Sequence, residues 1–248
     1  MSSGSKSTKA KTHKLKRALI SIDQILRDHT VRSTEAPTLS IRKVAIVVVA
    51  LAPVYGLAMG SYAYVVGERN LIQQIPQMLC SGIKVPLLIA ITVLVSLPSF
   101  FVINTLLGLR SDFRESLKAI VAAQAGLVII LCSLFPLTLF SYISMGGSEV
   151  SYQLAILFNA AMFGLASVAA QVQLHSYYRQ LIERDVRHRW MARMWIFVYA
   201  FVGIQAGYVL RPFIGNPVQP TAFLRKDSFR NAYVELFRLA NRVVESFF

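Results

Sequence analysis

Long apolar blocks separated by short polar gaps fill the chain from residue 44 to residue 214. Each block is close to the roughly 20 residues that a helix needs to cross about 30 Å of hydrocarbon. Apolar positions inside the blocks are gathered together and are not interleaved with polar ones at the periods of soluble strands or helices. The pattern predicts five transmembrane helices, at 44–66, 85–109, 119–143, 152–174 and 194–214.

Three further segments have a mixed pattern that cannot span a bilayer. Residues 14–29 place four apolar residues on one helical face, which predicts an amphipathic helix that lies on the membrane, docks on the spans or is solvated. The segment NLIQQIPQMLCSGIK is too short and too polar to span, so we expect it to lie along the interface. The tail after Pro220 has a strong apolar face and basic flanks, typical of a helix on the outer surface or on a partner.

The predicted fold class is therefore an all-α polytopic membrane helix bundle, with five transmembrane helices and N- and C-terminal amphipathic helices. Three regions follow from it: a basic cytosolic tail with an amphipathic helix (1–43), a five-span membrane domain (44–214) and a C-terminal amphipathic helix (215–248). Composition agrees, because 55% of the 248 residues are hydrophobic and only 15% are charged. A soluble domain would have about 25% charged residues.

The distribution of basic residues predicts the orientation. With the N-terminus in the cytosol, inner segments hold 18 Lys and Arg residues and outer segments hold 8. The internal loops alone give 8 against 2, the two being Arg69 and Lys84. The positive-inside rule therefore favours a cytosolic N-terminus and an external C-terminus.

The net charge of +14 indicates a partner surface of opposite sign. Ten basic residues precede residue 44, which predicts attraction to anionic lipid at the cytosolic face. Nucleic acid is the other partner for a basic tail, but no binding motif or aromatic-interleaved patch supports it.

Ionisable side chains and catalytic or metal-binding motifs are missing from the middle of the predicted spans. No Asp, Glu, Lys, Arg or His lies in the middle of any of them, which disfavours an ion-coupled carrier. No metal motif, Ser–His pair or Asp dyad is present at depth, so we expect no enzyme and no cofactor. The two cysteines, Cys80 and Cys132, belong to no Cys-x-x-Cys pair or Cys/His cluster.

Uncharged amides are the polar groups that the spans do contain. Asn104 and Gln124 lie at matched depth near the cytosolic side, and Asn159 and Gln205 lie at matched depth near the outer face. Matched amides on neighbouring helices predict interhelical hydrogen bonds that hold spans together. A polar pathway or a headgroup pocket is the alternative.

Small residues and prolines give the remaining packing signals. Small-x-x-x-small motifs, which let helix backbones approach closely, occur at Gly56 and Gly60, at Ala160 and Gly164, and at Gly203 and Gly207. We expect them to serve packing within the bundle, in a cluster of spans one, four and five, or dimerisation. Pro98 and Pro136 predict kinks in spans two and three.

Two inner loops carry clustered charge. The loop RSDFRESLK and residues 184–189 each mix acidic and basic side chains. They are interpreted either as solvated turns with weak ion pairs or as one shared docking surface on the cytosolic side.

Five spans, a basic N-terminal region, short loops and no ionisable group at depth resemble the Yip family of five-span, Rab-interacting membrane proteins. Stretches such as SLPSFFVINTLLGL and FVGIQAGYVLRPFIGNP are similar to bacterial members. The eukaryotic branch has an Asp-Leu-x-Gly-Pro motif before its first span, and STEAPTLSIRK lacks it. The resemblance implies the five-span topology, a bacterial cytoplasmic membrane and a role in membrane organisation or trafficking, without Rab-type binding.

These observations predict a non-enzymatic membrane protein that organises membranes or serves as an accessory subunit. Its expected partner is another membrane protein or a second copy of the chain. Two alternatives stay open. One is an oligomeric channel or permease for a small solute, lined by the four amides; the other is a lipid-handling protein with a groove opened by Pro98 and Pro136.

Overall fold

A computed structural model describes residues 41–216, 221–224 and 234. Its elements, in chain order, are α2 (Ile41–Gly60), α3 (Tyr62–Val65), α4 (Leu71–Leu106), the 3-10 helix η1 (Arg110–Asp112), α5 (Phe113–Ser133), α6 (Phe135–Met145), α7 (Glu149–Arg184) and α8 (Arg187–Val209). No strand occurs among the described residues, which confirms the all-α class. The predicted N-terminal amphipathic helix and almost all of the C-terminal one lie outside the described residues.

Four stretches are long and apolar enough to cross a membrane, which agrees with the expected membrane helix bundle. They are Leu71–Leu106, Arg110–Met145, Glu149–Arg184 and Arg187–Val209. The first predicted span corresponds to α2 and α3, whose described apolar stretch, Val44–Gly60, is shorter than these four. Large apolar side chains cover the outside of the bundle, as lipid contact requires, including Ile72 and Leu106, which are 83% and 80% exposed.

The start of α4 differs from the sequence-based expectation. Residues 71–84 do not form a separate interfacial segment; they are the first turns of a continuous helix of 36 residues. Asn70 caps this helix, and its backbone N–H donates to Oε1 of Gln73 over 3.4 Å. The helix is about 54 Å long at a rise of about 1.5 Å per residue, so it exceeds the thickness of the hydrocarbon.

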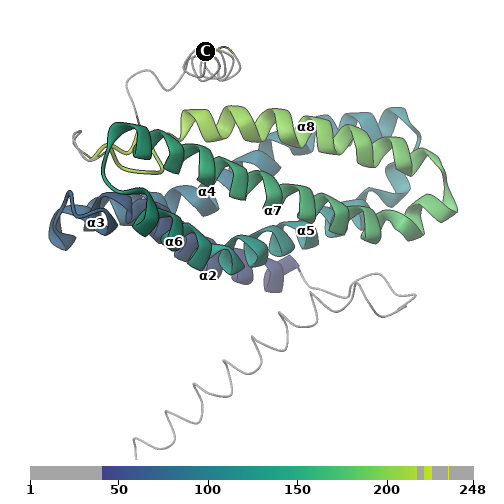
Figure 1. The fold of residues 1–248 in the computed structure, drawn as a ribbon. Helices are drawn as coiled ribbons and strands as arrows, with labels where there is room; N and C mark the ends of the chain where they lie inside the picture. Colours follow the sequence, from purple (N-terminus) through teal and green to yellow (C-terminus); the bar gives the residue numbers. More distant parts are fainter. Residues whose placement is uncertain (1–40, 217–220, 225–233, 235–248) are drawn as a thin grey trace, which may run out of the picture.

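The two predicted kinks have different outcomes. Pro98 lies inside α4, and the helix continues through it to Leu106. Pro136 lies in the first turn of α6, and Leu134 separates α5 from α6, so span three consists of two helices. Figure 1 shows α5 and α6 meeting at an angle. Proline is tolerated where a helix begins, because the first backbone N–H groups have no partner within the helix.

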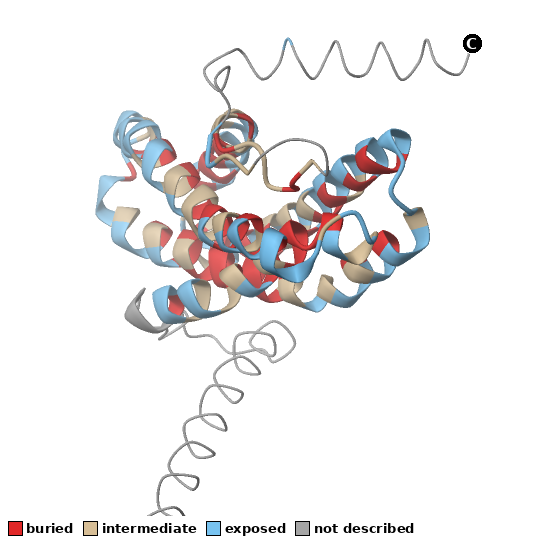
Figure 2. Ribbon diagram, turned by 90° about the vertical axis from the view of Figure 1, so that its left-hand side faces the viewer, coloured by how far each residue is buried: buried red, intermediate tan, exposed pale blue. Residues whose placement is uncertain are grey.

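Consecutive long helices run antiparallel, whereas α2 and α5 run in the same direction, with Val44 near Ala125 and Leu51 hydrogen-bonded to Cys132. In Figure 1, α7 and α8 run side by side along the molecule, α4 passes behind them, and α2 and α5 lie below. Contacts join α2 to α4 and α5, α5 to α7, and α4 to α8. Buried residues line the interior and exposed ones face outwards (Figure 2).

The bundle has two ends that differ in charge. We call residues 107–118 and 175–193 the basic end, because these segments hold eight of the Lys and Arg residues. The far end consists of residues 61–70, 146–148 and 210–216, which join or follow helices at the other side.

Candidate functional site

The amides near the basic end do not pair with each other. Asn104 is fully buried and donates from Nδ2 to the carbonyl of Leu109 over 2.9 Å. This bond fixes the chain just after the end of its own helix, α4. Gln124 on α5 accepts a hydrogen bond of 2.7 Å from the hydroxyl of Tyr199 on α8. The predicted Asn104–Gln124 bond is therefore wrong, although Gln124 does connect two helices.

Asn159 lies at the centre of a buried polar network near the far end. Its Nδ2 donates to the hydroxyl of Tyr142 over 2.7 Å and to the carbonyl of Ala155 over 2.8 Å. Its Oδ1 accepts from the hydroxyl of Tyr55 over 3.4 Å, and Thr138 donates to that same hydroxyl over 3.4 Å. These bonds join α2, α6 and α7. Asn159 was expected to pair with Gln205, which is instead half-buried on α8.

Two of the three small-residue motifs pack against α4. A methyl group built on Gly56 would lie 2.7 Å from Cα of Gly82, and one on Gly60 would lie 2.7 Å from Cα of Met78. Gly203 and Gly207 face the same helix more loosely. A methyl group built on Gly203 would lie 3.4 Å from the Thr92 side chain, and one on Gly207 would lie 3.9 Å from the Leu88 side chain. The common partner of these two motifs is therefore α4, which the predicted cluster of spans one, four and five did not include.

The third motif lies on the outside of the bundle. Ala160 and Gly164 are both exposed on α7, and nothing lies within 4 Å of a methyl group built on Gly164. This motif therefore does not mediate packing among the described helices.

Lys84 is a buried cation that sequence reasoning placed in a loop. It is the fourteenth residue of α4 and has no exposed surface. Its Nζ donates to the carbonyl of Pro212 over 2.6 Å and lies 5.0 Å from the centre of the Phe223 ring. The available signal was the spacing of Gln74, Gln77, Ser81 and Lys84, which forms one polar helical face.

That polar face of α4 holds the segment after α8. Ser81 and Gln77 donate to the carbonyl of Phe213, the latter over 3.2 Å. On the other side, the hydroxyl of Tyr152 donates to the carbonyl of Ile214 over 3.1 Å. The irregular backbone of residues 210–216 is thereby supplied with donors, which is the condition for non-helical chain to lie against a membrane bundle.

The two charged inner loops are brought together at the basic end. Arg184 and Glu115 form an ion pair of 3.1 Å, and the buried His188 ring lies 3.0 Å from a carboxylate oxygen of Asp112. Arg187 donates to Asp185 over 2.9 Å, and these hydrogen bonds hold the pKa of the Asp185 carboxyl below its usual value. The loops form one connected surface, as the docking interpretation requires, although exposed pairs of this kind contribute little stability.

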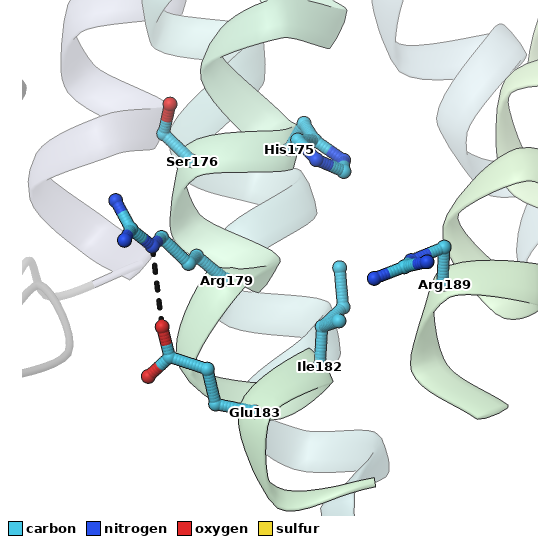
Figure 3. Close-up of a pocket in the computed structure, with 6 residues that line it drawn as sticks. All are labelled: His175, Ser176, Arg179, Ile182, Glu183 and Arg189. Atoms are coloured by element: carbon cyan, nitrogen blue, oxygen red, sulfur yellow. Dashed lines mark hydrogen bonds and ion pairs between the residues drawn. The ribbon is translucent and has the colours of Figure 1, made fainter. Parts of the chain in front are cut away.

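A cleft opens beside this surface, between α7 and α8. Its volume is about 440 Å³, and it is lined by His175, Ser176, Arg179, Ile182, Glu183 and Arg189. Figure 3 shows His175 and Arg189 extending into the gap from the two facing helices. Arg179 pairs with Glu183 over 3.2 Å. We call this site the α7/α8 cleft. Sequence reasoning missed it because it treated residues 175–193 as a loop, whereas α7 continues to Arg184 and α8 begins at Arg187.

Groups suited to metal binding are not gathered in the described part of the chain, where no cluster of three His, Cys, Asp or Glu side chains occurs. Both cysteines are free, and the thiol of Cys132 lies 3.1 Å from the carbonyl of Leu51.

Comparison with known proteins returned no relationship: no protein-family model, no curated protein and no solved structure matches the chain.

Proposed function

We propose that the chain is a non-enzymatic, five-span membrane protein that organises membranes or serves as an accessory subunit of a membrane complex. The observation that carries this proposal is the use of the buried amides. Asn104, Gln124 and Asn159 are each hydrogen-bonded inside their own bundle, in three separate places. The bonds of Gln124 and Asn159 hold different helices together, which is what a scaffold requires, and the bond of Asn104 fixes the end of α4.

The topology belongs to the same proposal. In this proposal, α2 is a span in addition to the four long stretches, which makes five. It packs along α4, with Gly56 and Gly60 in close contact with that helix. With the basic end in the cytosol, the N-terminus lies inside and the C-terminus outside, in a bacterial cytoplasmic membrane. The resemblance to bacterial relatives of the Yip family supports this placement and a role in membrane organisation.

The partner is another membrane protein or a second copy of the chain. The connected loops at the basic end favour a partner on that side, because Arg184–Glu115 and Asp112–His188 fix the relative position of two otherwise separate loops. Fixed charges give specificity to an encounter more than they give affinity.

Isolation of the full-length chain from its native membrane in several mild detergents tests the proposal. We expect a second protein in stoichiometric amount, or a homo-oligomer, after cross-linking in the membrane. Recovery of a monomer alone in every detergent would contradict it.

A channel or permease is the competing function, and liposome flux separates the two. We expect no uptake of glycerol or potassium ions above that of empty liposomes. Uptake that is changed by Gln205→Leu, at the half-buried amide, would favour the channel.

A further inference from the structure

The α7/α8 cleft offers hydrogen-bond donors that the bundle does not use. Arg189 is exposed and has no ion pair or hydrogen bond within the described part of the chain. Arg179 contacts Glu183 through Nε, and its side chain is 80% exposed, so its terminal amino groups face the solvent. Figure 3 shows the His175 ring and the Arg189 side chain extending into the gap from α7 and α8, with Arg179 and Glu183 turned to the other side of α7. The Arg189 guanidinium and the His175 ring N–H, facing one gap, match the oxygens of a phosphate.

The cleft lies at the depth of lipid headgroups. The predicted spans end at residue 174 on α7 and begin at residue 194 on α8, so the cleft residues lie just outside the hydrocarbon on both helices. Trp190 is 61% exposed beside the cleft, with the Arg193 guanidinium 5.4 Å from its ring centre. Exposed tryptophan is typical of the interface between lipid and water.

An apolar surface continues from the cleft towards the middle of the membrane. On α7, Val172 and Val168 precede His175 by one and two turns, and each is 64% exposed. On α8, Phe197 lies two turns beyond Arg189 and is 67% exposed. Helical residues spaced in this way share a face. The cleft therefore combines a cationic head with an apolar track, which is the complement of an amphiphile.

We propose that the α7/α8 cleft binds the phosphate group of an anionic phospholipid, whose acyl chain lies along the exposed apolar face of α7 and α8. Arg189 contacts the phosphate oxygens, and His175 donates a further hydrogen bond. The site does not depend on the proposed scaffold or accessory role, since a lipid can occupy it in a monomer.

Native mass spectrometry of the full-length protein, titrated with phosphatidylglycerol or phosphatidylcholine, tests the proposal. We expect phosphatidylglycerol to bind more tightly, and Arg189→Gln to weaken the first bound lipid by about tenfold or more, as for the loss of a hydrogen bond between charged groups. Arg189→Lys should lose less, because it retains the charge while losing the bidentate geometry. Arg189 makes no contact that folding needs, so these variants should fold normally.

Arg110→Gln is the matched control. Arg110 is also an exposed arginine at the basic end, but it does not line the cleft. Its loss should weaken phosphatidylglycerol binding by about fivefold at most, since only a general surface charge is removed. An equal loss in Arg110→Gln and Arg189→Gln would overturn the site in favour of unspecific attraction.

Inorganic phosphate and glycerol 3-phosphate distinguish the lipid from a soluble anion. We expect neither to displace phosphatidylglycerol at millimolar concentration, because they have no acyl chain to lie along Val172 and Phe197. Displacement at concentrations that match the affinity of the lipid would overturn the assignment to a phospholipid.

Discussion

Tyr199 on α8 donates a hydrogen bond of 2.7 Å to Oε1 of Gln124 on α5, across 75 positions of sequence. Both side chains are buried, at 7% and 5% exposure. The bond joins α5, in the third predicted span, to α8, in the fifth. Without it, the phenol hydroxyl and the amide would each lose a partner where no water can replace it.

We expect the pair to be energetically coupled. Tyr199→Phe and Gln124→Leu should each destabilise the protein, and the double variant should cost less than the sum of the two. The interaction energy should be about 0.6–1.7 kcal/mol, the range for hydrogen bonds between membrane helices. Unfolding of the four proteins in mixed detergent micelles measures it. Additive effects within about 0.3 kcal/mol would mean that the bond contributes nothing.

The same substitution should destabilise the protein at Gly56 on α2 and have little effect at Gly164 on α7. Gly56→Ala forces a methyl group towards the backbone of Gly82, 2.7 Å away, so α2 and α4 must separate. We expect a loss of about 1–3 kcal/mol in the free energy of unfolding, as for other overpacked interiors.

Gly164→Ala provides the control for this prediction. It adds the same methyl group to a helix where nothing lies within 4 Å, and its effect should stay within about 0.5 kcal/mol. Thermal melting of the purified variants compares the two. A loss at Gly164 as large as that at Gly56 would show that the exposed motif packs against something, such as a second copy.

The length and composition of the apolar blocks predicted the membrane bundle because a lipid core demands them. The start of α4 was not predictable in the same way. Its polar face, from Gln74 to Lys84, points inwards while Ile72 and Ile83 point outwards, which reverses the pattern of a soluble amphipathic helix. Polarity therefore indicated a surface segment where the chain forms a buried helix.

The amide partners could not be predicted for a different reason. Depth along a helix follows from sequence position, but rotation about the helix axis depends on packing. Gln124 and Asn104 have similar depths and face different neighbours, Tyr199 and the carbonyl of Leu109. The α7/α8 cleft was missed for a third reason, since both helices extend beyond the predicted spans, to Arg184 and from Arg187.

Lys84 should control the attachment of the segment that follows α8. Lys84→Met keeps the volume and removes the donor to the carbonyl of Pro212, so residues 210–216 should open more often. Loss of a hydrogen bond to a charged group corresponds to roughly a tenfold or larger rise in local opening. We expect that increase in the labelling rate of Ile214→Cys, a position that is 4% exposed, after replacement of both native cysteines by Ala.

Lys118→Met serves as the control for Lys84→Met. Lys118 is exposed on α5 at the basic end, so its replacement removes the same charge without contacting residues 210–216. The labelling rate of Ile214→Cys should be the same with Lys118→Met as without it. Unchanged labelling in Lys84→Met would show that Ser81, Gln77 and Tyr152 hold the segment without the lysine.

Cysteine labelling in whole cells tests the orientation. Val150 lies in the first turn of α7 at the far end and is 67% exposed, and Ser111 lies in η1 at the basic end and is also exposed. Because basic loops are retained in the cytosol, a membrane-impermeant maleimide should label Val150→Cys in intact cells and Ser111→Cys only after permeabilisation. Val150 is preferable to Ser148, two residues earlier, since the Ser148 side chain accepts a hydrogen bond from the backbone of Ser151 and caps α7. Labelling of Ser111→Cys in intact cells, with Val150→Cys protected, would reverse the topology and place the α7/α8 cleft in the outer leaflet.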